Sequence, residues 1–212
     1  MAAIGIMGGT FNPIHIGHTE IAKAAYVQYH LDEIWFMPNH IPAYKSEDKI
    51  VSGEDRLKMI QLAIQDLPYC KASDFELKRD GNTYTIDTLK LLKKQYLEHN
   101  FYFIMGADSL FSFDKWRDYQ KIPNYAIILV APRDEKSKMD VMVEINKLNE
   151  CFGKNCFHMI DCKEIPCSSS RIRELLTDNA WRYDKQYVSE MDSYLSEAVH
   201  AYICSNHLYE KE

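Results

Sequence analysis

The order of short β-rich runs and longer helical stretches constrains the fold of this chain most strongly. Runs rich in Ile, Val, Phe and Tyr alternate with amphipathic stretches of ten or more residues, which indicates repeated βαβ units. The predicted strands are Ala3–Met7, Glu33–Met37, Phe101–Met105, Tyr125–Ala131 and Cys156–Ile160. Because crossover helices cover both faces of such strands, this order predicts an α/β fold with a doubly wound, mostly parallel sheet.

Apolar side chains at helical spacing predict helices between and after these strands. Ser52 and Asp55 form a helix start that resembles a capping box, and a second helix follows Thr85. The residues expected on buried helix faces are Leu57, Ile60, Ile64 and Leu67 in the first, Ile86, Leu89, Leu92 and Tyr96 in the second, and Val188, Met191, Leu195, Val199 and Tyr202 in one long C-terminal helix. Packing against the core is the role expected of that last helix.

The length and charge of the chain predict one domain that does not bind nucleic acid. Its 212 residues, 46% of them hydrophobic, suffice for one sizeable core. We expect a single domain over 1–212, with a small helical C-terminal part at about 168–212. The net charge of −6 argues against a general nucleic-acid binder, because an excess of Lys and Arg holds a phosphate backbone.

Cysteine usage and hydropathy indicate a cytoplasmic protein with no membrane partner. The chain has six cysteines, but it is long enough to fold without disulfides and shows no secretory signal. The longest apolar run, Ala126–Ala131, is too short to span a bilayer. The cysteine-rich segment Cys151–Cys167 lacks C-x-x-C spacing, so we expect no structural zinc there.

The segment GGTFNPIHIGH, Gly8–His18, joins the first predicted strand to a helical stretch. This junction lies at the carboxyl end of a strand, where the next helix directs free N–H groups and a positive dipole end at a ligand. Gly8 and Gly9 permit close approach to the backbone and Thr10 offers a hydroxyl, which suits a phosphate group. A tight turn without a ligand is the alternative interpretation of the two glycines.

His15 and His18 favour an anion at this loop. A gap of three residues at a helix start puts both imidazoles on one side, near the positive end of the helix dipole. The alternatives are surface histidines without function and a zinc site, which would need a third ligand that the neighbouring sequence lacks. The spacing fits neither G-x-G-x-x-G nor G-x-x-x-x-G-K-[ST], which argues against a standard dinucleotide site or P-loop.

A second segment, CSSSRIRELL at Cys167–Leu176, repeats the combination of hydroxyls and a helix start. Its three serines precede Arg171, Arg173 and a helical pattern. Because a guanidinium pairs with phosphate oxygens in a fork, this segment could hold the other end of a polyphosphate. A plain N-cap with solvated arginines is the alternative.

These two segments together resemble the paired signatures of the nucleotidyltransferase superfamily, which implies a Rossmann-like nucleotidyltransferase fold. Four further blocks resemble the bacterial nicotinate mononucleotide adenylyltransferases, so that the resemblance runs nearly from end to end. These blocks are DEIWFMPNHIPAYK (Asp32–Lys45), TYTIDTL (Thr83–Leu89), GADSLFSFDKW (Gly106–Trp116) and YICSNHLY (Tyr202–Tyr209). The chain has Asn12 where that family usually has Asp, and Ser170 where it usually has Thr.

The resemblance implies transfer of the adenylyl group of ATP to nicotinate mononucleotide, giving nicotinate adenine dinucleotide and pyrophosphate in NAD biosynthesis. The positions expected at ATP are Gly8, Gly9, Thr10, Phe11, His15, His18, Gly106, Asp108, Ser168, Ser169, Ser170 and Arg173. Those expected at nicotinate mononucleotide are Asn39, Lys45, Thr85, Trp116 and Arg117. In that family a tryptophan stacks on the nicotinate ring, which matches Trp116, and backbone N–H groups near Thr85 and Arg117 would receive its carboxylate.

Three of these positions also have an interpretation from their own chemistry. Trp116 is flat and polarisable, so it suits a pyridinium ring, with core packing as the alternative. Thr85 lies at a predicted helix N-cap, where an N–H can receive a carboxylate, with capping alone as the alternative. Lys45 follows a Pro-containing loop and could reach a substrate phosphate, although a lone loop lysine is more often solvated.

The expected chemistry is electrostatic. Both substrates carry phosphates, so the protein must neutralise charge and align the attacking oxygen with the departing pyrophosphate, and no general base is expected. We expect His18, His15 and Arg173 as catalytic groups, with Mg²⁺ carried by ATP. The alternatives are a related adenylyl- or cytidylyltransferase acting on nicotinamide mononucleotide or phosphopantetheine, and a nucleotide-sensing module without catalysis. The sequence leaves open whether the protein forms a homo-oligomer.

Overall fold

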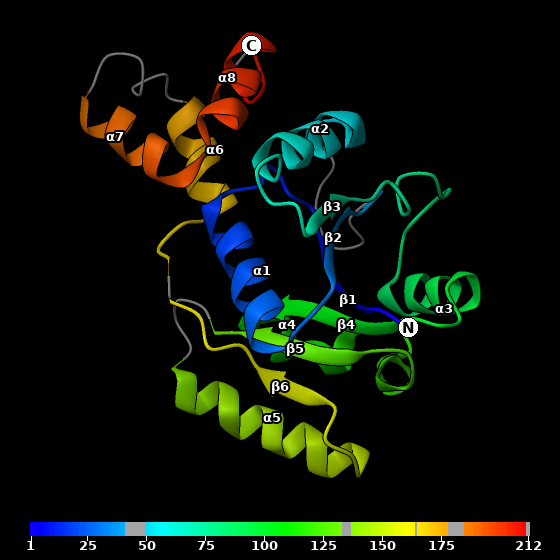
Figure 1. Cartoon of the computed structure of the whole chain (residues 1–212). Helices are drawn as coiled ribbons and strands as arrows, with labels where there is room; N and C mark the ends of the chain where they lie inside the picture. Colours follow the sequence, from blue (N-terminus) through cyan, green and yellow to red (C-terminus); the bar gives the residue numbers. More distant parts are fainter. Residues whose placement is uncertain (41–49, 133–136, 164, 178–184, 211–212) are drawn as a thin grey trace.

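The computed structural model describes residues 1–40, 50–132, 137–163, 165–177 and 185–210. Within these ranges six strands form one sheet in the order β3-β2-β1-β4-β5-β6 (Figure 1). The strands are β1 (Ala3–Gly9), β2 (Glu33–Pro38), β3 (Cys70–Ala72), β4 (Asn100–Gly106), β5 (Ile127–Ala131) and β6 (Phe157–Met159). Each neighbouring pair is parallel, which confirms the predicted α/β class.

Helices cover both faces of the sheet, so the sheet is doubly wound. One face packs against α1 (Ile16–Gln28) and α2 (Gly53–Ala63). The C-terminal helices α6 (Ser169–Thr177), α7 (Lys185–Tyr194) and α8 (Glu197–Ser205) extend the same apolar core beside these two helices. The other face packs against α3 (Thr85–Gln95), α4 (Ala107–Leu110), α5 (Lys138–Phe152) and the 3-10 segments η2 (Phe113–Lys115) and η3 (Tyr119–Asn124). In Figure 1 the three C-terminal helices gather beside α1 and α2, away from α5.

Alternating strand side chains supply two separate apolar cores. On β1, Met7 joins the core under α1, whereas Ile4 and Ile6 join the core under α3. On β5, Leu129 and Val130 divide in the same way. Because consecutive side chains of a strand point to opposite faces, β1 and β5 are apolar on both sides, and their sequences are nearly continuous hydrophobic runs.

The path of the chain places a crevice beside β1. After β3 the chain crosses to β4, on the other side of β1, and continues outward to β5 and β6. Open parallel sheets bind ligands beyond the carboxyl ends of the strands at such a reversal. The segment Gly8–His18 leaves the sheet at this point, since β1 ends at Gly9 and α1 begins at Ile16.

The prediction of one long C-terminal helix is wrong. The chain forms α7 and α8 instead, because Ser196 has an extended backbone (φ −67°, ψ 150°) and caps α8. Its Oγ accepts the N–H of Val199 at 3.4 Å. The apolar spacing from Val188 to Tyr202 continues across this break, which is why the spacing alone did not reveal it.

Several other boundaries also differ from the prediction. Leu67 lies beyond α2, in a turn where its N–H donates to Ile64 O at 2.9 Å. β5 begins at Ile127, because the N–H of Tyr125 still closes η3 on Ile122 O at 2.9 Å. The sequence did not predict β3, which has only three residues, and β6 is shorter than expected, covering Phe157–Met159. The single domain over 1–212 stays a prediction.

Candidate active site

The loop between β1 and α1 is held in place from two sides. Arg173 on α6 donates from Nη1 to Asn12 O at 2.7 Å, and Ser169 Oγ donates to Pro13 O at 2.9 Å. On the opposite side, Arg56 on α2 donates from Nη1 to Thr10 O at 2.9 Å. The two segments predicted to hold a polyphosphate are therefore in direct contact, although they lie more than 150 residues apart in the sequence.

His15 and His18 lie against each other at the start of α1. Their ring centroids are 3.8 Å apart, and the Nδ1 atom of His18 accepts the backbone N–H of His15 at 3.2 Å. When Nδ1 accepts a hydrogen bond, the proton of a neutral imidazole lies on Nε2, so Nε2 of His18 is a donor. The pair therefore offers a fixed N–H group beside the helix N-terminus.

The glycines of this loop make room for aromatic rings as well as for a ligand. A Cβ atom at Gly17 would lie 3.0 Å from the ring of His15, and one at Gly9 would lie 3.2 Å from the ring of Phe11. Phe11 has a positive φ of 50° and packs its ring edge-on to His18, with centroids 5.1 Å apart. Gly17 and Gly9 thus allow the two histidines and Phe11 to pack closely.

The serines of the second segment cap α6 and orient Arg173. Ser168 Oγ accepts the N–H of Arg171 at 3.1 Å, as expected for an N-cap. Ser170 Oγ accepts Nη2 of Arg173 at 3.2 Å, which directs that guanidinium toward the loop. Arg171 instead pairs with Glu190 on α7, with Nε and Oε1 3.0 Å apart.

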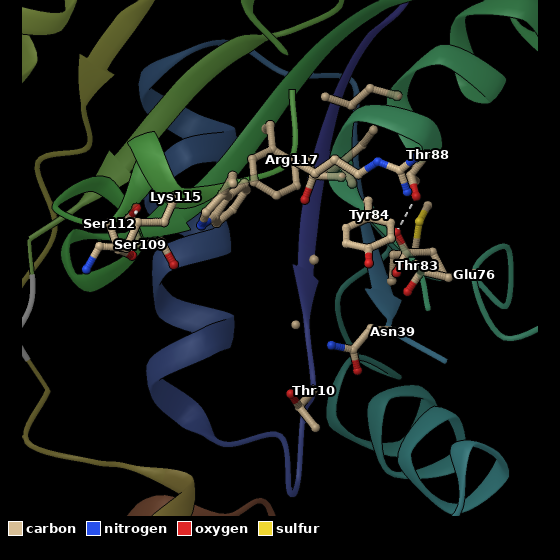
Figure 2. A pocket seen from close by; sticks show the side chains of 18 residues that line it. Thr10, Asn39, Glu76, Thr83, Tyr84, Thr88, Ser109, Ser112, Lys115 and Arg117 are labelled. Atoms are coloured by element: carbon tan, nitrogen blue, oxygen red, sulfur yellow. Dashed lines mark hydrogen bonds between the residues drawn. The ribbon is translucent and has the colours of Figure 1, made fainter. Parts of the chain in front are cut away.

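A cavity of about 430 Å³ lies in front of β1, between α3 and the segment that follows β4 (Figure 2). Its floor is apolar and comes from strands and α3: Ile6, Met37, Leu89 and Phe103. The predicted residues that line it are Gly8, Gly9, Thr10, Asn39, Thr85, Trp116 and Arg117. Positions assigned to both substrates therefore meet around one space.

Trp116 and Arg117 form one wall of this cavity. The indole of Trp116 is held edge-on by Phe103, with centroids 5.9 Å apart, and packs against Phe113 at 5.6 Å. Trp116 is therefore both a packing residue and an accessible aromatic surface. The guanidinium of Arg117 lies 4.6 Å from the ring centre of Tyr84, across the opening of the cavity.

Thr85 is the first residue of α3, not its N-cap. The N-cap is Tyr84, whose backbone is extended (φ −110°, ψ 137°). The shift of one residue places the N–H of Thr85 among the first groups of the helix, which have no partner within it. These N–H groups border the cavity, which both Tyr84 and Thr85 line.

Glu76, Arg79 and Thr88 form a polar cluster at the cavity that the sequence analysis did not identify. Thr88 Oγ1 donates to the buried Oε1 of Glu76 at 2.5 Å and accepts Nη1 of Arg79 at 2.8 Å. Burial raises the pKa of Glu76, and its hydrogen bond to Thr88 opposes this shift. The available sequence signal was Thr88, a hydroxyl residue between the apolar Ile86 and Leu89 of α3.

Most of the positions predicted at ATP do not line this cavity: Phe11, His15, His18, Ser168, Ser169, Ser170, Arg173, Gly106 and Asp108. Gly106 is the N-cap of α4 at the end of β4, and Asp108 lies in the first turn of α4. A Cβ atom built at Gly106 would meet nothing within 4 Å, so a ligand has open space there. Lys45 lies outside the described residues.

The described residues show neither a metal-binding cluster nor a helix that could span a membrane. Among them, no group of three or more His, Cys, Asp or Glu side chains is arranged to hold a metal ion. The helices within the described ranges are all too short or too polar to cross a membrane. Cys70 is a buried free thiol, and burial raises its pKa to about 12.

Comparisons with known proteins show the family of this chain. The family model described as cytidylyltransferase-like matches residues 6–175. A protein of Lachnoclostridium phytofermentans, named "Probable nicotinate-nucleotide adenylyltransferase", is 41% identical over 99% of this chain and 100% of its own length. One of Shewanella frigidimarina with the same name is 34% identical over 97% of this chain and 99% of its own length.

A solved structure supports the fold. Plasmodium falciparum nicotinic acid mononucleotide adenylyltransferase complexed with NaAD aligns with a TM-score of 0.77 and 22% identity, covering 99% of this chain and 98% of that one. At this identity the likeness concerns the fold, whereas the 41% and 34% identities concern the family. The chain belongs to the cytidylyltransferase-like family and, within it, to the nicotinate-nucleotide adenylyltransferases.

Proposed function

We propose that this protein transfers the adenylyl group of ATP to nicotinate mononucleotide and releases pyrophosphate. One observation carries the proposal: His15 and His18 lie 3.8 Å apart at the start of α1, in a loop that Arg173 holds from the far end of the chain. This arrangement brings an imidazole N–H, a helix N-terminus and a guanidinium to one loop. Such a set of fixed donors suits the phosphates of a nucleotide.

The reaction needs no covalent intermediate with the protein. An oxygen of the 5′-phosphate of nicotinate mononucleotide attacks the α-phosphorus of ATP, forming one P–O bond as the bond to the bridging β-oxygen breaks. The electron pair of that broken bond leaves with pyrophosphate. Because the attacking phosphate is already ionised at neutral pH, the protein has no proton to remove and instead positions the groups and stabilises charge.

His18 is the catalytic group with the clearest geometry. Its Nε2–H would donate to an oxygen of the α-phosphate as negative charge increases in the transition state. The N–H groups of the Gly8–His18 loop would assist, and Arg173 would face the β- and γ-phosphates. His15, expected as a phosphate contact, is only 5% exposed, so it would assist by holding His18 in place. The bond from His15 N–H to His18 Nδ1, at 3.2 Å, supports this assignment because it fixes the ring and its tautomer.

The cavity beside the loop would take nicotinate mononucleotide. Trp116 would stack on the pyridinium ring, since a flat polarisable surface attracts a ring that carries positive charge. Backbone N–H groups near Thr85, at the positive end of the α3 dipole, and near Arg117 would receive the carboxylate. Asn39 and Lys45 would contact the remainder of this substrate. An amide in place of the carboxylate would lose the charge interaction, which favours the acid over nicotinamide mononucleotide.

We infer that Mg²⁺ arrives bound to ATP. Mg²⁺ prefers oxygen ligands and usually keeps several waters, so the phosphate oxygens of the substrate suit it. When bound, it neutralises part of the phosphate charge. Gly8, Gly9, Ser168 and Ser169 would then hold the nucleotide through N–H and hydroxyl groups. We also propose that the protein works in the cytoplasm. A measurement of its molecular mass in solution would show whether it forms a homo-oligomer.

A pyrophosphate-release assay tests the function. The protein is mixed with ATP, Mg²⁺ and either nicotinate or nicotinamide mononucleotide, and phosphopantetheine serves as a third acceptor. We expect pyrophosphate and nicotinate adenine dinucleotide in equal amounts, with the acid mononucleotide used at the highest kcat/KM. Release with phosphopantetheine but with neither mononucleotide would assign the chain to another transferase, and ATP binding without release from any acceptor would indicate a sensing module.

A further inference from the structure

Arg56 on α2 is a charged side chain with only 2% of its surface exposed. It is among the largest fully buried side chains of the described residues. Removing a guanidinium from water is costly unless its donors and its charge are both compensated. Arginine does not escape this cost by losing its proton, because its pKa is too high.

Five hydrogen bonds satisfy the donors of Arg56. Nε donates to Val51 O at 3.2 Å, and Nη1 donates to Thr10 O at 2.9 Å and Asn39 Oδ1 at 3.4 Å. Nη2 donates to Asn39 O at 2.8 Å and His40 O at 3.3 Å. All five acceptors are uncharged oxygens, so the hydrogen bonding is complete while no described residue neutralises the charge.

The neighbouring acid on α2 is engaged elsewhere. Asp55 accepts Ser52 Oγ at 2.6 Å and Tyr202 OH at 2.8 Å, on the side of α8. None of the ion pairs among the described residues includes Arg56. Arg56 is therefore a buried cation that lacks a carboxylate partner within this part of the chain.

This cation lies directly behind the wall of the nucleotide crevice. Two of its partners, Thr10 and Asn39, line the cavity, and Figure 2 shows them near the ends of β1 and β2. These ends meet because β1 and β2 are paired in parallel and Asn39 N–H donates to Gly9 O at 3.0 Å. A ligand in front of Thr10 and Asn39 is thus separated from the guanidinium by a single layer of backbone.

The same bonds orient the loop. In a trans peptide the C=O group and the following N–H group point in opposite directions. Because Arg56 binds the carbonyl oxygen of Thr10, the N–H of Phe11 points away from Arg56. Arg56 and Arg173 hold carbonyl oxygens two residues apart, at Thr10 and Asn12.

We propose that Arg56 is the buried counter-charge of the nucleotide phosphates: it positions the loops at Thr10 and Asn39, and its unneutralised charge attracts the phosphate groups that bind in front of them. Arg56 does not touch the ligand, so it is a positioning residue. The inference rests on the proposed function only in requiring an anionic nucleotide. It assigns to the phosphates the role that a carboxylate plays in an ordinary buried ion pair.

Binding measurements on substituted proteins separate charge from geometry. Arg56→Gln removes the charge, Arg56→Lys keeps it with fewer donors, and Lys58→Gln removes a charge from an exposed position of the same helix. Affinities for AMP, ADP and ATP are measured by calorimetry without Mg²⁺, with folding verified by circular dichroism. We expect Arg56→Gln to weaken ATP binding roughly tenfold or more, and AMP binding less, because attraction increases with phosphate charge. Arg56→Lys should stay within about threefold of the original protein, as should Lys58→Gln.

Equal losses for AMP and ATP, or an Arg56→Lys protein as weak as Arg56→Gln, would show that loop geometry alone matters and would overturn the proposal. A measurement on the unsubstituted protein covers the case in which Arg56→Gln does not fold. The ¹⁵N resonance of Arg56 Nε–H, assigned by its loss in Arg56→Lys, should shift more with ATP than with AMP, whereas an equal response would contradict the charge role. These readouts need no turnover, so a protein that binds ATP through Arg56 but makes no dinucleotide would refute the proposed function and leave this inference intact.

Discussion

The Nδ1 atom of His18 accepts the backbone N–H of His15 at 3.2 Å, so each histidine of the pair restrains the other. His15 supplies the N-cap backbone of α1, and His18 occupies the third position of the helix. The hydrogen bond leaves Nε2 of His18 as the donor. A donor held in this way needs no reorganisation when phosphate charge develops in front of it.

Replacing His18 with Ala should lower kcat by about 10² to 10³, because one preorganised donor to the transition state is lost. The KM values for both substrates should change much less. His30→Asn is the matched control, since His30 is exposed and Asn tolerates its positive φ of 51°. The pyrophosphate assay measures both, and near-normal turnover by His18→Ala would contradict the assignment.

Replacing Trp116 with Ala should raise the KM for nicotinate mononucleotide by about tenfold or more, because the stacking surface is removed. The KM for ATP should stay within about twofold, since Trp116 borders the cavity and not the histidine loop. Trp116→Phe retains an aromatic face and should recover most of the affinity. Equal increases in both KM values would instead indicate a general loss of structure around Phe103 and Phe113.

Tyr209 near the C-terminus should affect ATP binding, because its OH donates to Asn12 Oδ1 at 2.9 Å inside the loop. Tyr209→Phe should cost about 1 kcal/mol of unfolding free energy and raise the KM for ATP several-fold. Tyr202→Phe is the control: it removes the bond to Asp55, outside the loop, and should cost stability without changing that KM. An unchanged KM for ATP in both proteins would show that the tail stabilises the fold alone.

Glu76 should make stability depend on pH in a direction opposite to that of a salt-bridged acid. Burial raises its pKa above 4.5, so the folded state holds the proton at a pH where the unfolded state has lost it. The stabilising contribution of the protonated group is complete below about pH 4.5 and is lost as the pH rises through the folded pKa. The unfolding free energy of the original protein should therefore fall with rising pH relative to that of Glu76→Gln, which does not titrate at this position, as followed by urea unfolding. A rise relative to Glu76→Gln would mean that the carboxyl is stabilised in its charged form.

Asn149 on α5 should protect the edge strand β6 from aggregation. Its Oδ1 accepts the N–H groups of Cys156 and Phe157, both at 2.9 Å, and its Nδ2 donates to Phe157 O at 3.0 Å. Asn149→Ala should cost about 2–3 kcal/mol and promote aggregation, because these groups of an edge strand lose their partners. Asn146→Ala, at an exposed position of the same helix, should change neither the unfolding midpoint nor light scattering. Equal behaviour of the two proteins would assign the protection to Gln28 and Tyr29, which donate to Met159 O.

Local patterns were sufficient wherever neighbouring residues determine the structure. The alternation of apolar runs and amphipathic stretches predicted the parallel sheet, because strand and helix periods depend on residues a few positions apart. The loop Gly8–His18 was predicted in the same way, since the strand end, the glycines and both histidines are contiguous. Ser52 also fits its prediction, as its Oγ accepts the N–H of Asp55 at 3.0 Å.

Contacts between residues distant in sequence determined the burial, side-chain partners and helix break that local patterns did not predict. Arg56 and Glu76 read as ordinary charged residues, and only the segments that close over them bury one beside Thr10 and the other beside Thr88. The break at Ser196 likewise depends on a capping bond that competes with a continuous apolar spacing. The charge and type of a side chain are properties of the chain alone, whereas its burial and partners depend on residues distant in sequence. These distant contacts bury Arg56 and Glu76 beside the candidate site.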